Sequence, residues 1–204
     1  MNKIGRTLLS LLVVALVLGV GTATAQNTPP DYDYDVGYFA NANAAGAPSA
    51  HLRLTNDGSF EDAINLCANI YVFDNNEEME ECCSCMITPD GYLDLSVNSN
   101  LLGNILDHGT KPTRGIIKVV SSSFLVAKDL CTPTLFDPFS GIKGWLTHVQ
   151  KGATAGTFSL TETPLTDSAL NFPDELEVNL QETCGFVQSL GSGTGVCSCA
   201  DAGD

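Results

Sequence analysis

Short stretches in which apolar and polar residues alternate recur along the chain, separated by turn residues. Leu52 and Leu54 alternate with polar neighbours ahead of the turn signal at residues 56–58. Residues 66–73 (LCANIYVF) are dense in β-branched and aromatic side chains, as in a buried strand. Further strands are predicted at 92–97, 116–120, 145–149 and 157–161. Short strands between Gly and Pro turns predict a mainly β domain, either a sandwich or a partly closed barrel.

The C-terminal part has the period of a helix. Pro173 suits a first helical turn, and acidic residues follow it, as the helix dipole favours. The positions that form one apolar stripe are Leu176, Leu180, Cys184, Val187 and Leu190. Gly191 provides a stop. We therefore expect one amphipathic helix over residues 173–190, packed on the sheet.

Two segments show neither the alternation of a strand nor the three- and four-residue spacing of a helix. Residues 26–50 are poor in large aliphatic side chains and rich in Asn, Ala, Gly, Pro and Asp, which predicts a flexible N-terminal arm. Residues 74–81 carry five acidic side chains in eight positions, which predicts an exposed loop or short turn. The expected domain therefore begins at residue 51 and extends to residue 204.

The first 25 residues have the pattern of a secretory signal peptide. Lys3 and Arg6 precede an apolar run over residues 8–20, and Ala23-Thr24-Ala25 supplies the small-x-small cleavage pattern. The run is short for a membrane span. We expect cleavage before Gln26 and a secreted protein, extracellular or periplasmic, with no membrane span after signal cleavage.

Eight cysteines follow the predicted signal peptide: Cys67, Cys82, Cys83, Cys85, Cys131, Cys184, Cys197 and Cys199. An even number in an oxidising compartment predicts a disulfide framework. We expect Cys67 to pair within the 82–85 cluster, and Cys184 to pair with Cys197 or Cys199. The alternative is a thiolate metal or iron–sulfur site at residues 82–85, but its C-C-x-C spacing differs from the usual C-x-x-C pairs and it would need reduced sulfur.

Net charge narrows the range of partners. The chain carries a formal charge of −15, and removing the two signal-region cations would make it −17. This acidity argues against binding to nucleic acid or to an anionic membrane surface. Residues 111–151 are locally basic. Their lysines either lie beside acidic neighbours of the same molecule or form a basic face. Such a face would favour self-association or binding to another cell-surface protein.

Candidate catalytic residues are sparse. The histidines are His51, His108 and His148, and a serine run lies at residues 121–123, but no G-x-S-x-G elbow is present. We expect the histidines to be structural or surface residues. With twenty-four acidic residues, nothing selects a carboxylate pair for glycoside hydrolysis.

Two loop motifs also fail as ligand sites. The acidic run at residues 31–35 resembles the start of a calcium loop, yet its glycine comes one residue late and its twelfth position is Ala42. The glycine-rich stretch at residues 191–195 follows a helix, whereas a phosphate loop precedes one. We therefore predict no cofactor and no metal. The aromatics that could bind a sugar, or belong to the core, are Tyr71, Phe73, Tyr92 and Trp145.

Several motifs together resemble a known group. They are CANIYVFD at 67–74, CCSC at 82–85, VNSNL at 97–101 and FVQSLGSG at 186–193, with the closing cysteine pair. This pattern resembles a group of small exported bacterial proteins of unassigned function. The resemblance implies bacterial export and a single domain, and it implies no chemistry.

The sequence therefore predicts an exported, non-catalytic structural or interaction protein stabilised by disulfides. Its arm could add a strand to the sheet edge of a neighbour. The alternatives are a secreted small-ligand or glycan-binding module, marked by exposed aromatics in a groove, and a secreted hydrolase, marked by a histidine or a carboxylate pair in a cleft.

Overall fold

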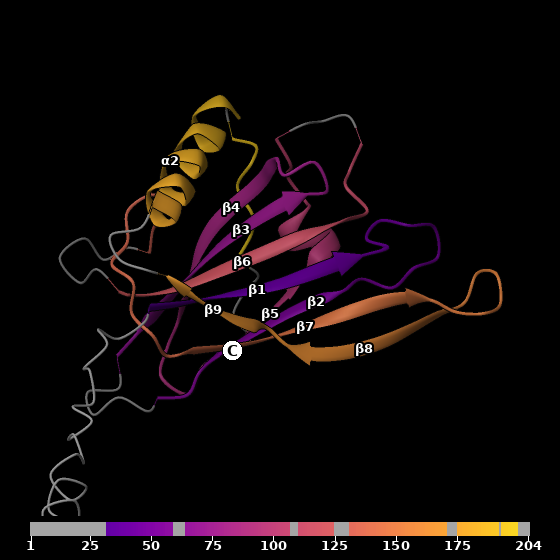
Figure 1. The fold of residues 1–204 in the computed structure, drawn as a ribbon, viewed down its shortest axis with the longest axis horizontal. Helices are drawn as coiled ribbons and strands as arrows, with labels where there is room; N and C mark the ends of the chain where they lie inside the picture. The colour runs from indigo at the N-terminus through magenta and orange to yellow at the C-terminus, as the bar shows by residue number, and fades with distance from the viewer. Residues whose placement is uncertain are drawn as a thin grey trace, which may run out of the picture. The chain divides into compact units, whose positions relative to one another are not determined.

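Two antiparallel sheets face each other as a sandwich in the computed structural model (Figure 1). The structure describes residues 32–58, 64–106, 110–124, 131–170, 175–191 and 193–199. The five-stranded sheet has the order β4-β3-β6-β1-β9, and the four-stranded sheet has the order β5-β2-β7-β8. The strands are β1 (Tyr32–Ala40), β2 (His51–Asn56), β3 (Leu66–Asp74), β4 (Met79–Ile87), β5 (Tyr92–Ser96), β6 (Arg114–Ser123), β7 (Ile142–Lys151), β8 (Phe158–Pro164) and β9 (Thr166–Leu170). The mainly β prediction is confirmed.

One stretch of chain joins the two sheets at an edge. Strand β8 pairs with β7 in the four-stranded sheet, and β9 pairs with β1 in the other. Between them lies the buried Leu165, whose N–H donates to the carbonyl oxygen of Gly144 at 2.9 Å. The chain therefore changes sheets at a single residue, and the sandwich is partly closed on this side. Beyond it, the β7–β8 hairpin projects from the body (Figure 1).

The main core lies between the sheets, where the inward-facing residues of strands such as β2, β3 and β5 meet. In β2 the burial alternates along the strand, so that Leu52 and Leu54 face inward. In β3 the inward residues include Ile70 and Val72. The other face of β3 is buried as well, because a helix covers it. This explains why residues 66–73 read as one continuous apolar strand.

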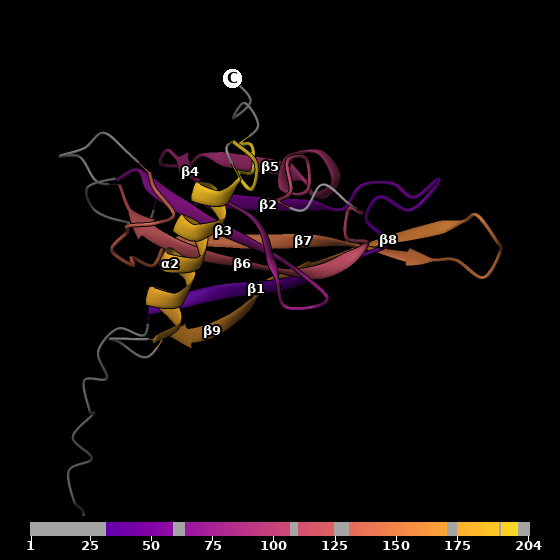
Figure 2. The ribbon, with the colours of Figure 1, turned by 90° about the horizontal axis from the view of Figure 1, so that it is seen from above.

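The helix α2 (Glu175–Leu190) confirms the predicted C-terminal helix over its described residues. Its axis runs across the strands of the five-stranded sheet (Figure 2). Leu180, Cys184 and Val187 of its inward stripe form a second core cluster with Tyr71 of β3 and Val120 of β6. The N–H of Gly191 donates to the carbonyl oxygen of Val187 at the C-terminal end. A short π-helical turn, η1 (Val97–Leu101), follows β5.

The flexible arm expected over residues 26–50 is corrected by strand β1. Residues 32–40 of that segment pair with β6 on one side and β9 on the other, inside the five-stranded sheet. Few large aliphatics are needed there, because Gly37 lets Leu146 and Leu165 approach so closely that an added Cβ would lie 2.6–2.7 Å from them. A composition that resembles a solvated arm thus serves a tight contact between the sheets. Residues 26–31 lie outside the described residues.

The acidic segment over residues 74–81 is only partly the exposed loop that we expected. Residues 75–78 turn at the surface, but Met79 already begins β4, and Glu80 and Glu81 are buried. A register irregularity between Val72 and Phe73 accompanies this change. Strand pairing with β3 here overrides the low strand propensity of glutamate.

No helix among the described residues is long and apolar enough to cross a membrane.

Candidate functional site

Four disulfides join all eight cysteines, which confirms the predicted covalent framework. The bridges are Cys67–Cys131, Cys82–Cys184, Cys83–Cys197 and Cys85–Cys199. The expected pairings of Cys67 within the 82–85 cluster and of Cys184 with Cys197 or Cys199 of the C-terminal tail (residues 193–199) are both wrong. The sulfurs of the cluster are bonded to other sulfurs, whereas a thiolate metal site would need them reduced.

The alternation of strand faces explains these corrections. Cys67 lies opposite Met86 on β4, and Cys85 lies opposite Ala68, so Cys85 points to the other face of the sheet. On the helix-covered face Cys82 meets Cys184 of α2 instead. On the opposite face of β4, Cys83 is left for the tail.

The tail runs along the free edge of β4. The N–H of Cys82 donates to the carbonyl oxygen of Gly195 at 3.0 Å, and Cys82 and Val196 form a parallel bridge. Cys197 and Cys199 then reach Cys83 and Cys85 in matching register. Two C-x-C motifs are therefore joined side by side, because residues two apart share one face of an extended chain.

A cleft of about 620 Å³ opens on the outer face of the five-stranded sheet, at one end of β1, β6 and β3. Register places Tyr38, Ile116 and Phe73 on this face, directly across from one another on the three strands. Tyr38 and Ile116 are exposed, and Phe73 is half-buried. Arg114 and Lys118 supply two cations to the wall, and the 74–77 turn, which adds the carboxylates of Asp74 and Glu77, closes one side.

Lys118 is the unusual residue of the cleft. Its Nζ lies 5.2 Å from the ring centroid of Phe73 and 5.8 Å from that of Tyr34. Burial lowers the pKa of Lys118, because a half-buried ammonium is poorly hydrated. The ion pairs among the described residues involve neither Lys118 nor Arg114. For Lys118, the expectation that central-strand lysines lie beside acidic neighbours is therefore replaced by contacts with aromatic rings.

The outer face of the four-stranded sheet carries a network of charged side chains. Arg53 of β2 lies at its centre, and its Nε donates to Asp94 Oδ2 at 3.2 Å. Its Nη1 donates to Thr147 Oγ1 at 3.2 Å and forms an ion pair with Glu162 of β8. The bond to Glu162 raises the pKa of Arg53. His51 Nδ1 lies 2.6 Å from Asp94 Oδ1.

Two exposed aromatics flank this network. Tyr92 of β5 is 52% exposed, and Trp145 of β7 is 36% exposed. The Tyr92 hydroxyl donates to Asp94 Oδ2 at 3.1 Å, and burial raises the pKa of that phenol. Burial alone would raise the pKa of Asp94, but the hydrogen bonds from His51 and Tyr92 outweigh it and lower that pKa. The face is polar and preorganised, with a ring at each side.

The candidate histidines do not converge. His51 lies on the outer face of the four-stranded sheet, whereas the buried His148 stacks on Tyr38 with ring centroids 4.2 Å apart. His148 Nε2 lies 2.6 Å from Thr163 Oγ1, and its Nδ1 has no hydrogen-bond partner among the described atoms. His108 lies outside the described residues. His51 and Asp94 are paired like the histidine and aspartate of a Ser-His-Asp triad. However, no serine hydroxyl is hydrogen-bonded to His51 in the described part of the chain.

The other predicted site residues have structural roles. Tyr71 is buried and donates its hydroxyl hydrogen to the carbonyl oxygen of Pro133 at 2.7 Å. Ser122 is buried beside the side-chain amide of Asn69, which donates to it. Residues 32–35 belong to β1 instead of a calcium loop.

Glu81 was not a candidate from the sequence, yet it is the most buried carboxyl group in the described chain. The residue is 0% exposed; its Oε1 accepts the N–H of Asn104 at 2.6 Å, and its Oε2 has no hydrogen-bond partner among the described residues. Burial raises the pKa of Glu81 to about 7, although Asn104 and the charge of Lys111 act in the opposite direction. Asn104 in turn donates its side-chain N–H to Gly193 in the tail at 2.7 Å. Glu81 therefore supports the loop on which the tail rests.

Sequence reasoning also missed the Lys118 cleft. The available signal was a lone cation within the apolar strand 116–120, because a charged side chain between aliphatic neighbours has to lie at a surface, in an ion pair or over aromatic rings. Nothing local indicated which rings would surround it. They come from β1 and β3, which are far away in the sequence.

Comparisons with known proteins add little to this geometry. No protein-family model matches the chain, and no curated protein matches it. Among solved structures, the crystal structure of Thermotoga maritima 1070 is similar over 66% of this chain and 90% of that one, with 14% identity and a TM-score of 0.40.

Proposed function

We propose that this protein is an exported, non-catalytic binding protein whose ligand site is the cleft around Lys118. The cleft volume falls within the roughly 300–1,000 Å³ of typical small-molecule sites. Its lining also fits that class, because aromatic and aliphatic side chains stand beside four charged groups, the cations Arg114 and Lys118 and the carboxylates Asp74 and Glu77. The four disulfides are typical of proteins in an oxidising compartment, which supports export.

The observation that carries the proposal is the half-buried position of the Lys118 ammonium near two aromatic rings. Lys118 is half-buried and forms no ion pair with the residues that the structure describes, so its ammonium loses hydration and gains contacts with Phe73 and Tyr34. An anionic group that enters the cleft would pair with the Lys118 ammonium and so replace the stabilisation that the ammonium loses with its hydration. The apolar side chains of the cleft would then cover the body of the ligand. The ligand class is therefore a small organic anion with an aromatic or other apolar body.

The test uses 8-anilinonaphthalene-1-sulfonate, a fluorescent aromatic anion, with displacement by phenylacetate and by its neutral counterpart phenylacetamide. Lys118→Met keeps the apolar stem and removes the charge. Because a hydrogen bond to a charged group contributes about 1.5–3 kcal/mol, the variant should bind at least about tenfold more weakly. Lys143→Met, at an exposed position on β7, is the matched control and should bind like the parent protein. Equal affinity of the Lys118 variant, or equal displacement by the neutral compound, would contradict the proposal.

A second candidate is a carbohydrate site on the outer face of the four-stranded sheet. Its support is the pair of exposed rings, Tyr92 and Trp145, beside the fixed hydrogen-bonding groups of Arg53 and Asp94. Rings with polar neighbours suit ligands that present both C–H faces and hydroxyl groups. Binding to a glycan array that is lost in Trp145→Ala would support this candidate, and an array with no bound glycan would count against it.

A further inference from the structure

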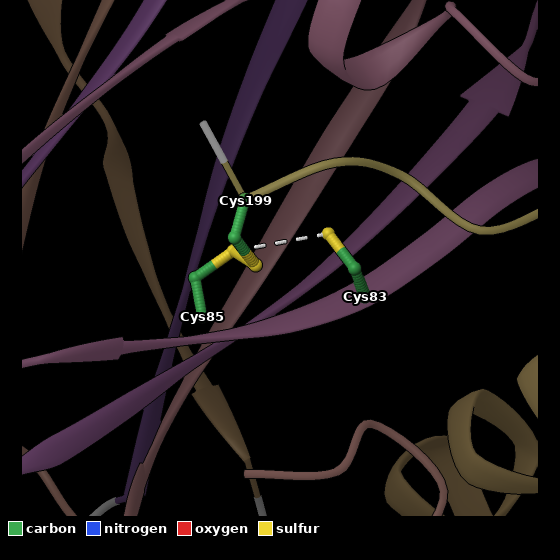
Figure 3. A group of neighbouring side chains, drawn as sticks. All are labelled: Cys83, Cys85 and Cys199. Carbon is green, nitrogen blue, oxygen red and sulfur yellow. Dashed lines mark hydrogen bonds between the residues drawn. A yellow bond between two sulfur atoms is a disulfide. The ribbon is translucent and has the colours of Figure 1, made fainter. Parts of the chain in front are cut away.

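The two disulfides that fasten the tail to β4 lie against each other. Cys83 Sγ is 4.0 Å from Cys85 Sγ, and both sulfurs lie within 4.8 Å of Cys199 Sγ. Figure 3 marks the contact between Cys83 Sγ and Cys85 Sγ with a dashed line. Because a thiolate attacks a disulfide sulfur directly, a thiolate set free in one bridge would already touch the other.

Exposure distinguishes one cysteine residue from the rest. Six of the eight cysteines are buried and Cys131 is half-buried, whereas Cys199 is exposed. Access decides which sulfur an external thiolate can reach. The buried Cys82–Cys184 bridge under α2 is shielded at both ends.

We propose that Cys85–Cys199 is a thiol-exchange site, and that Cys85 passes the exchange to Cys83–Cys197. In the first step, the thiolate of a small external thiol attacks Cys199 Sγ. A mixed disulfide forms at Cys199, the Cys85–Cys199 bond breaks, and its electron pair leaves on Cys85 as a thiolate. The protein gains one thiol molecule, and the number of disulfide bonds does not change.

In the second step the Cys85 thiolate attacks Cys83 Sγ. The Cys83–Cys85 bond forms, the Cys83–Cys197 bond breaks, and the electron pair leaves on Cys197. Residues two apart in a strand have Cα atoms about 6.6 Å apart, near the upper end of the disulfide range of about 4.4–6.8 Å. The two thiolate forms therefore interconvert, and in the second form no covalent bond holds the tail to β4.

The experiment treats the native, disulfide-intact protein with reduced glutathione at pH 8 and traps free thiols with iodoacetamide. Mass spectrometry selects molecules that carry one glutathione and one alkyl group, and peptide mapping locates both. The expected result is glutathione on Cys199, with the alkyl group on Cys85 in some molecules and on Cys197 in others. The double variant Cys83→Ser/Cys197→Ser should keep the adduct on Cys199 and carry the alkyl group on Cys85 alone.

The parent protein alone can overturn the proposal, so it does not depend on the folding of the variant. An absence of any adduct under native conditions, or a first adduct on Cys131, would refute the exchange site. A singly adducted protein in which Cys197 is never alkylated would refute the transfer between the two bridges.

Discussion

Replacing Glu81 by glutamine should change how stability depends on pH. Glu81 is fully buried, with one carboxyl oxygen hydrogen-bonded to the N–H of Asn104 and the other without a hydrogen-bond partner in the part of the chain that the structure describes. The amide of Glu81→Gln keeps an oxygen for the Asn104 N–H and cannot ionise. The groups whose charges act on Glu81 are Lys111, which favours ionisation, and Glu80, which opposes it.

The pKa of Glu81 determines the sign and the size of the effect. Burial raises it from 4.5 to about 7 in the folded protein. Below pH 4.5 the carboxyl group is protonated in both the folded and the unfolded state. Between pH 4.5 and 7 the unfolded chain releases the proton and the folded protein keeps it, so the free energy of unfolding falls as pH rises. At about 1.4 kcal/mol per pH unit, the total loss is roughly 3 kcal/mol.

Urea unfolding of the disulfide-intact protein and of Glu81→Gln, measured from acidic to mildly alkaline pH, tests this. The variant should gain stability relative to the parent as pH rises, by roughly 3 kcal/mol across the range. Glu78→Gln, an exposed neighbour in the turn before β4, is the control and should stay within about 0.5 kcal/mol of the parent at every pH. A difference between the parent and Glu81→Gln that does not change with pH would refute the reasoning.

Two further predictions concern packing and covalent structure. An added Cβ at Gly115 would lie 1.9 Å from the carbonyl oxygen of Phe73, so Gly115→Ala must separate β6 from β3 and should cost about 1–3 kcal/mol, seen as a lower midpoint in thermal unfolding; an unchanged midpoint would contradict this contact. Replacing Cys82 and Cys184 together by serine removes a bridge across 102 residues and should cost about 2–5 kcal/mol in urea unfolding. A loss below about 1 kcal/mol would show that α2 is held by packing alone.

The fold class could be predicted from the sequence because local patterns carry it. Residues 66–73 combine β-branched and aromatic side chains, and 173–190 show a 3.6-residue period, and both predictions match elements of the structure. Strand β1 could not be found in this way. Its residues include tyrosine, aspartate and glycine, and the strand is stable because β6 and β9 pair with both of its edges. That information is not local.

The disulfide pairing and the cleft could not be predicted from the sequence for the same reason. Sequence spacing favours disulfides between cysteines that are close in the chain. The actual pairing depends on the face of β4 on which each sulfur lies, and that face is set by the register of β4 with β3. Cys82 and Cys83 are adjacent, yet one bonds to the helix and the other to the tail. Lys118 could be noticed as an isolated cation, but its surroundings could not, because Tyr34 and Phe73 come from two other strands.

The long spans of the four bridges, from 64 to 114 residues, have a consequence for biogenesis. No cysteine bonds to the one next to it in the sequence, so oxidation in order of emergence would join wrong partners. The native bonds of Cys83 and Cys85 can form only after Cys197 and Cys199, more than a hundred residues later in the chain, have been synthesised. Oxidative maturation of this protein should therefore be slow and should depend on a disulfide isomerase to reshuffle early bonds.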